Sequence, residues 1–208
     1  MPLPLNCPIG QPILGPRRGR GAPAARVYRT KNTALRRERP GMPDVGEEPC
    51  FGCGGRFPAK SGPKHSYMLS TPGCWASYGR LLAREYENPA LFGAVHRLTV
   101  DAFALQHPGD ANDRRAVQSV WVHYAALRLA FEHGRAHTEI TRIMQTLARA
   151  TFAPLPEAPK GFDMTHADVI AAAETLHASM VRDWARCAYA AWAALSRPTD
   201  MLLERLGV

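Results

Sequence analysis

The sequence predicts a mainly α protein: a helical bundle of five to six helices, preceded by a loop that carries a zinc knuckle. Three observations support this prediction. The 208 residues are 46% hydrophobic and 21% charged, which is enough apolar material for one core of ordinary size. From residue 71 onward, apolar side chains recur at helical spacing between clear helix boundaries. Cys50 and Cys53, two cysteines at knuckle spacing, precede the first of these helices.

The basic character of the chain is confined to residues 1–41. These residues hold nine of the 26 Lys and Arg residues but one of the 18 Asp and Glu residues, so residues 42–208 carry 17 of each. Prolines and glycines interrupt every possible helix or strand of this basic segment, which is expected to be disordered. Two explanations stay open: a real basic tail, or translation that begins at Met42, which we favour. Nucleic-acid binding is not expected without residues 1–41.

The domain organisation expected from these features has three parts. Residues 1–41 form the basic segment, residues 42–70 the zinc-knuckle loop and residues 71–208 the helical bundle. Five unevenly spread cysteines do not resemble the dense disulfide frameworks of small secreted domains, so a cytoplasmic location is expected. No apolar run approaches the roughly 18 residues of a membrane span.

The knuckle is the segment from Cys50 to Gly55, which reads Cys-Phe-Gly-Cys-Gly-Gly. Two thiolates at this spacing point at one centre, and glycines tolerate the backbone angles of the turn between them. The favoured interpretation is a metal site. A redox pair and two thiols without a metal stay open, although the surroundings lack the strand and helix that a redox motif requires.

The first helix is expected to run from Thr71, as its N-cap, to about Tyr86. Pro72 occupies a position that tolerates proline, which places Cys74 in the first turn. A cysteine at a helix N-terminus after a knuckle often completes a zinc site, and the helix dipole favours its thiolate. The alternative is a buried structural cysteine.

The second helix is expected to open at Asn88-Pro89 and to stop at Pro108-Gly109. Its short connection to the first helix forces an antiparallel hairpin, which brings His107 within about one turn of Cys74. The predicted zinc ligands are therefore Cys50, Cys53, Cys74 and His107. A helix-capping or hydrogen-bonded role for His107, with no metal, is an equally weighted alternative.

Four motifs together resemble an uncharacterised bacterial family, domain of unknown function 5946. They are Cys-Phe-Gly-Cys-Gly at 50–54, Pro-Gly-Cys-Trp at 72–75, Leu-Ala-Arg-Glu-Tyr at 82–86, and His-Arg-Leu-Thr-Val-Asp-Ala-Phe-Ala-Leu-Gln-His-Pro-Gly at 96–109. The resemblance is specific over residues 48–133 and starts near Met42. It implies a set of residues to test, which are Cys50, Cys53, Cys74, His96, Asp101, His107 and His123. It implies no reaction.

The third helix is expected from Asn112 or Asp113 to His133, with Gly134 in the position that needs positive φ. A second antiparallel hairpin then places His123 opposite residue 97. His96, Asp101 and His123 become candidates for a catalytic metal or for acid–base chemistry. Against this, Asp101 lies about 140° around the helix from His96. The alternative is a buried polar pair, with Asp101 bonded to Arg97 or to loop amides.

The remaining chain is also expected to be helical. One helix covers Ala136 to Ala150, and a capping box at Thr165-x-x-Asp168 opens a long helix to about Leu195, which could break near Thr175. A short last helix is expected over residues 200–206. His177 is placed on the solvated or interfacial edge of the long helix.

Three function classes follow from these features. The favoured class is a non-catalytic cytoplasmic protein with a mainly structural zinc, whose surface binds a protein partner or a second copy of the chain. The first alternative is a metal-dependent enzyme, a hydrolase or transferase, that uses His96, Asp101 and His123. The second alternative is nucleic-acid binding through the zinc unit and the basic segment. No motif in the sequence names a substrate.

Overall fold

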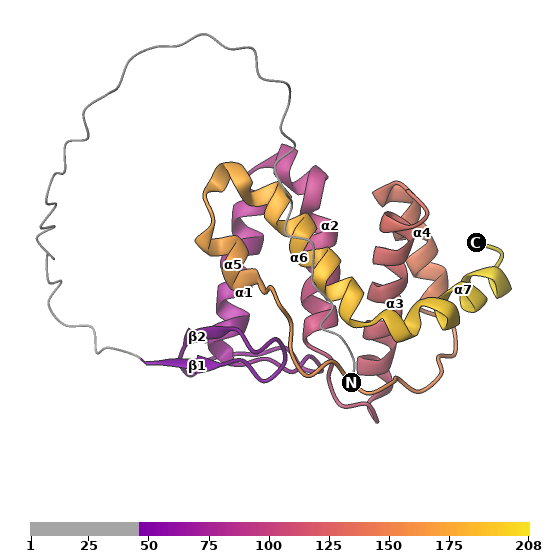
Figure 1. Ribbon diagram of the computed structural model, residues 1–208, viewed down its shortest axis with the longest axis horizontal. Coiled ribbons are helices and arrows are strands. Elements are labelled where there is room, and N and C mark those ends of the chain that lie inside the picture. The colour runs from indigo at the N-terminus through magenta and orange to yellow at the C-terminus, as the bar shows by residue number, and fades with distance from the viewer. Residues whose placement is uncertain (1–45) are drawn as a thin grey trace, which may run out of the picture.

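The computed structural model describes residues 46–208, which form a helical bundle with a small hairpin at one end (Figure 1). These residues contain seven α-helices, two short 3-10 helices and one two-stranded sheet. The predicted mainly α bundle is confirmed, with one more α-helix than expected. The basic segment 1–41 and the expected start at Met42 lie outside the described residues.

The hairpin consists of β1 (Glu47–Pro49) and β2 (Arg56–Pro58), which pair antiparallel with Glu48 opposite Phe57. The two strands bring both ends of the knuckle together, so Cys50 and Cys53 lie in the turn between them. Phe57, in the middle of β2, is the strand residue that enters the core, since only 2% of its surface is exposed.

The first two helices form the predicted antiparallel hairpin. Helix α1 (Pro72–Tyr86) begins after Thr71, whose side chain accepts a hydrogen bond from the Cys74 amide, and α2 (Pro89–Gln106) begins after Asn88, which caps it in the same way. Both predicted N-caps are confirmed. The start of α1 and the end of α2 therefore lie at the same end of the bundle.

The third and fourth helices each follow a turn and pack beside the helix that precedes them. Helix α3 (Arg114–Phe131) begins after the N-cap Asp113 and ends two residues earlier than predicted. Gly134, at φ 60°, makes the left-handed turn that leads toward α4 (His137–Leu147). Helices α2 and α3, and then α3 and α4, pack against each other.

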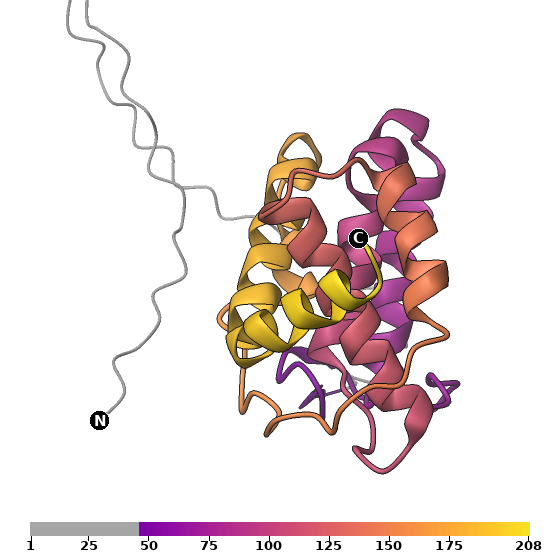
Figure 2. The ribbon, with the colours of Figure 1, turned by 90° about the vertical axis from the view of Figure 1, so that its right-hand side faces the viewer.

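The predicted long C-terminal helix is divided. The capping box at Thr165 and Asp168 is present, but α5 (His166–Ala171) stops after six residues, because Ala172 takes an extended conformation. A 3-10 turn, η1 (Glu174–Leu176), then leads into α6 (His177–Ala191), and η2 (Ala193–Leu195) leads into α7 (Ser196–Arg205). The division lets α5 pack on α1 while α6 crosses α2 (Figures 1 and 2).

Helix α2 is the centre of the bundle, because it packs against α1, α3 and most extensively α6. Two tryptophans of the α6 region fix the C-terminal end of α2. The Trp184 indole donates to the side-chain oxygen of the buried Gln106 at 2.9 Å, and the Trp192 indole donates to the Leu105 carbonyl at 2.9 Å. The chain segment that carries His107 is therefore held by hydrogen bonds from the α6 region.

None of the helices within residues 46–208 combines the length and the apolar character that a membrane span needs.

Candidate metal centre

The knuckle turn is closed by two backbone hydrogen bonds. The Cys50 amide donates to the Gly55 carbonyl at 2.8 Å, and the Gly54 amide donates to the Cys50 carbonyl at 3.0 Å. Gly54 has φ 73°, in the left-handed region where a side chain is strained. The turn that faces both sulfurs inward thus needs glycine at residue 54 for its backbone angle.

Gly52 is required for a different reason, which is close approach. A Cβ at this position would lie 2.3 Å from the Leu69 carbonyl oxygen, 2.7 Å from Cδ2 of His107 and 2.8 Å from the Gln106 carbonyl oxygen. The sequence predicted this glycine only as a residue that tolerates turn angles. The structure shows that the missing side chain lets the knuckle contact the end of α2.

Cys74 reaches the knuckle from the first turn of α1, as predicted. Thr71 caps the helix, and the next residue after Pro72, Gly73, packs so closely on β2 that a Cβ would lie 2.2 Å from the Pro58 carbonyl oxygen. This contact fixes the height of α1 relative to the hairpin. The Cys74 side chain, with none of its surface exposed, therefore points at the two knuckle sulfurs.

His107 completes the group from the end of α2. The backbone amide of His107 donates to the Ala104 carbonyl, which leaves the Phe103 carbonyl without this helical partner. The ring nitrogen Nδ1 of His107 donates to the Phe103 carbonyl instead, at 2.7 Å. The proton therefore resides on Nδ1, and the lone pair of Nε2 faces Cys74 Sγ at 3.2 Å. The Phe103 ring stacks on the imidazole at 3.9 Å between centroids.

The four predicted ligands thus converge. Their ligand atoms all lie within 4.8 Å of one another, and the exposed fractions of Cys50, Cys53, Cys74 and His107 are 4%, 1%, 0% and 1%. A zinc ion with bonds of about 2.3 Å to sulfur and about 2.0 Å to nitrogen separates tetrahedral ligand atoms by about 3.5 to 3.8 Å. The residues present fit a tetrahedral metal ion.

The electrostatics of the cluster favour a cation. Hydrogen bonds from Cys53 and Cys74 lower the pKa of Cys50, so one sulfur is readily ionised. The contact with the Cys50 sulfur raises the pKa of Cys53 to about 12, and contacts with both other sulfurs together with burial raise the pKa of Cys74. A bound divalent cation would stabilise all three thiolates and so remove the free-energy cost of ionising Cys53 and Cys74.

A second buried histidine, His166, lies beside the cluster and was missed by the sequence analysis. It is the first residue of α5, has no exposed surface and stacks on Phe57 at 4.6 Å. Neither ring nitrogen has a hydrogen-bond partner within residues 46–208. Burial, aided by the nearby His107, lowers the pKa of His166 to about 3, so the ring is neutral.

The predicted trio of His96, Asp101 and His123 is divided between two contacts. His96 Nδ1 lies 2.8 Å from Glu85 Oε2, and His123 Nδ1 lies 2.7 Å from Asp101 Oδ1. Asp101 also accepts a hydrogen bond from Arg97 at 3.0 Å, which was the predicted alternative. Within residues 46–208, the only His, Cys, Asp and Glu group close enough to share a metal ion is the Cys and His cluster described above.

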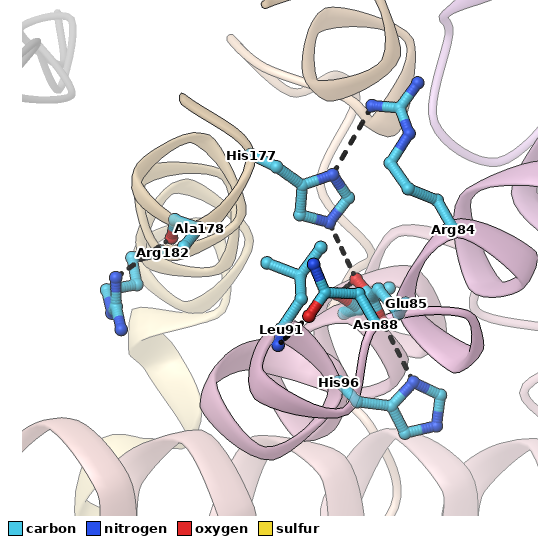
Figure 3. Close-up of polar contacts among 9 residues, drawn as sticks. Arg84, Glu85, Asn88, Leu91, His96, His177, Ala178 and Arg182 are labelled. Atoms are coloured by element: carbon cyan, nitrogen blue, oxygen red, sulfur yellow. Dashed lines mark hydrogen bonds and ion pairs between the residues drawn. The ribbon is translucent and has the colours of Figure 1, made fainter. Parts of the chain in front are cut away.

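Glu85 is the centre of a buried polar cluster, and it was not among the candidate site residues of the sequence analysis. Its carboxylate has no exposed surface and lies between two imidazoles, with His177 Nε2 at 3.1 Å and His96 on the other side (Figure 3). Thr99 donates a further hydrogen bond at 2.5 Å. The prediction that His177 lies on a solvated or interfacial edge of the long helix is wrong, because the break before α6 turns this side chain onto Glu85 and buries it within the bundle.

Glu85 lies in the motif at 82–86, but its position on the helix explains why it was not singled out as a site residue. On α1 it reads as an ordinary polar residue near the end of the helix, and its partners come from α2 and from α6, which starts 92 residues later. Arg84 approaches the other nitrogen of His177 at 3.5 Å, so a cation lies near this buried carboxylate (Figure 3). The cluster joins three helices.

The fold and the site together define a helical bundle whose N-terminal hairpin closes a buried Cys3His cluster suited to a metal ion. The chain belongs to a family of unknown function, DUF5946, whose match covers residues 48–193. This match confirms the resemblance drawn from the four motifs. No curated protein matches the chain, and no solved structure matches it.

Replacing Gly52 with alanine is expected to weaken the centre. The new methyl group would collide with two carbonyl oxygens and with the His107 ring, at an expected cost of about 1–3 kcal/mol in the free energy of unfolding. Urea denaturation measures this cost. Gly79→Ala is the matched control: it lies mid-helix in α1 with open space around it, so it should leave stability unchanged or raise it by up to about 1 kcal/mol. Equal effects of the two substitutions would contradict the close packing.

Replacing His166 with leucine should make the free energy of unfolding depend less on pH below about pH 6.5. The unfolded imidazole binds a proton near pH 6.5 and the folded one only near pH 3, so wild-type stability is complete above pH 6.5 and falls by up to about 1.4 kcal/mol per pH unit below it. His166→Leu removes this contribution and two unsatisfied nitrogens. Urea titrations of both proteins from pH 7 to 4 measure the difference. If the free energies of unfolding of the two proteins change in parallel with pH, His166 is not the source of the pH dependence.

Proposed function

We propose that this chain is a zinc protein in which the metal is mainly structural and fastens the N-terminal hairpin to the helical bundle. The observation that carries the proposal is the convergence of Cys50, Cys53, Cys74 and His107, four buried side chains from three separate parts of the chain. Each is held by a separate local device: the knuckle turn, a helix N-cap and the anchored tautomer of His107.

The donor set supports zinc over other common ions. Three sulfurs and one imidazole suit a borderline-soft ion with tetrahedral preference, whereas magnesium and calcium prefer oxygen ligands and higher coordination numbers. Thiolate ligands also need a reducing compartment, which supports a cytoplasmic location.

The closed surroundings support a structural role. Four protein ligands fill a tetrahedral ion, and the ligands are at most 4% exposed, so no coordination position is left for water or substrate. Apart from Phe57, few hairpin residues enter the core, and Phe51 at the tip of the knuckle is 68% exposed. Zinc binding would thus supply stabilisation that apolar burial does not.

Purified protein is expected to contain one zinc ion per chain by elemental analysis. If free zinc exceeds the dissociation constant by 100- to 1,000-fold, removing it with a chelator should lower the free energy of unfolding by about 3–4 kcal/mol. Cys53→Ser and His107→Gln should abolish stoichiometric zinc binding. His133→Gln, at an exposed site, is the matched control and should keep the ion.

Two results would contradict this role. One is a protein whose unfolding midpoint is unaffected when zinc is removed. The other is a reversible disulfide between Cys50 and Cys53 in the purified protein, which would favour the redox interpretation.

We further propose that the tip of the α1–α2 hairpin binds a second copy of the chain. Tyr86 is 62% exposed and Phe92 is 40% exposed, and their rings lie 5.3 Å apart, with His96 stacked on Phe92 at 4.3 Å. Large aromatic side chains exposed together are typical of protein interfaces. A homodimer through this surface would bury both rings against their equivalents.

Sedimentation equilibrium tests the homodimer. The wild-type protein is expected to dimerise, and a Tyr86→Ser/Phe92→Ser variant is expected to dissociate at least about tenfold more readily, since both rings lose their contacts. Met201→Ser is the control, because it removes a 53% exposed apolar side chain from α7. The proposal is overturned if the wild-type protein stays monomeric over a 100-fold range of protein concentration.

The other two function classes are not proposed. A metal-dependent reaction at His96, Asp101 and His123 receives no support, since these residues form no metal-binding group among residues 46–208. Nucleic-acid binding depends on residues 1–41, which lie outside the described residues, and the remainder carries equal numbers of basic and acidic residues.

A further inference from the structure

A cavity of about 260 Å³ lies between α3, the end of α4 and the loop before α1. Its volume is slightly below the roughly 300 Å³ at which pockets for drug-sized ligands begin. Arg115, Ser119 and His123 line it from α3 at a spacing of four residues, so they form one row on one helix face. Tyr67 closes it from the loop. We call this space the His123 cavity.

His123 enters the cavity with a fixed orientation. Its Nδ1 contacts Asp101 Oδ1 at 2.7 Å, and Asp101, only 1% exposed, is held in turn by Arg97 at 3.0 Å. A carboxylate accepts only, so Nδ1 donates and Nε2 is left for a ligand. The His123 side chain keeps 17% of its surface exposed, which gives a ligand access to it.

Ser119 lies one turn before His123 and adds an unused polar group. Its hydroxyl oxygen is buried and has no hydrogen-bond partner within residues 46–208. A serine in a helix ordinarily bonds back to the preceding turn or to water, and a buried hydroxyl without a partner costs free energy. A ligand in the cavity would supply the partner that the protein does not.

Arg115 provides charge at the mouth of the cavity. Its guanidinium lies over the Tyr67 ring, 5.5 Å from the centroid, and it bonds to Asp113 through Nε and Nη2. These bonds leave Nη1 without a partner among the described residues, and it can donate to a second acceptor. Asp113 itself does not line the cavity.

The lining therefore favours one chemical class of ligand. It offers donors from Arg115, Ser119 and Tyr67, with the His123 imidazole beside them, and none of the lining residues within the described chain is acidic. Val122 and Ala148 supply apolar surface beside these donors. A ligand with an anionic group and a small apolar body matches both features.

We propose that the His123 cavity binds a small organic anion, a carboxylate or a phosphate monoester, whose charged group lies between Arg115, Ser119 and His123. This site goes beyond the proposed structural zinc, with which it shares no residue. Asp101 is a positioning residue in it, because it contacts His123 rather than the ligand.

Histidine ring signals in NMR spectra of the zinc-loaded full chain test the proposal. The chain has eight histidines, and loss of one Cε1–H signal in His123→Gln assigns the probe. Benzoate and phenyl phosphate are the anionic probes, and phenol is their neutral counterpart. At least one anion is expected to shift the His123 signal saturably, with a dissociation constant below about 1 mM, while phenol does not. The tighter anion distinguishes carboxylate from phosphate.

Two neighbouring arginines provide a matched pair of variants. Arg115→Gln is expected to weaken binding at least about tenfold, whereas Arg114→Gln, the same charge change at an exposed residue outside the cavity, should stay within about twofold. Ser119→Ala should weaken binding without lowering the unfolding midpoint. The proposal is overturned if neither anion shifts the signal more than phenol does, or if both arginine variants weaken binding equally.

Discussion

The convergence of four buried ligand side chains at one end of the bundle is the constraint on which the described structure most depends. Three sulfurs and an imidazole within 4.8 Å of one another cannot all be in their ligand forms without a cation, because thiolates at this distance repel each other in a dry environment. The hairpin, the start of α1 and the end of α2 must therefore be held close together. The contacts of Gly52 and Gly73, where no side chain fits, show how closely these three segments approach.

The opposite end of the α1–α2 hairpin is organised around a different buried group. Glu85 carries a carboxylate in a site without solvent, and His96, His177 and Thr99 surround it from α2 and α6. Such a cluster costs desolvation, which well-placed hydrogen bonds offset. The bundle is thus fixed at both ends by polar groups: sulfur and imidazole near the hairpin, and carboxylate and imidazole near the α1–α2 turn. The apolar core between them, with Trp184 and Trp192, fills the intervening volume.

The metal ligands could be predicted from the sequence because each depends on local rules. The spacing of Cys50 and Cys53 defines a turn, Thr71 and Pro72 define the helix start that carries Cys74, and the two-residue connection at Glu87 and Asn88 sets the register that brings His107 to the same end. The register argument placed His96, Asp101 and His123 near one another, while the angle of about 140° between His96 and Asp101 around α2 already argued against a shared face. His96 turns toward α1 and His123 toward α2, so each histidine meets a different carboxylate.

The sequence alone determined the helical class, the helix starts with their caps and the identity of the four converging side chains, since all of these follow from periodicity, capping and short connections. Only the tertiary structure decided which polar residues are buried together. Glu85 and His177 are 92 residues apart, and although the sequence placed a break near Thr175, where the structure has it, only the packing of α6 decided that His177 faces Glu85. The same holds for His166 and for the His123 cavity, because burial and the shape of the surface arise from the packing of distant helices rather than from any local pattern.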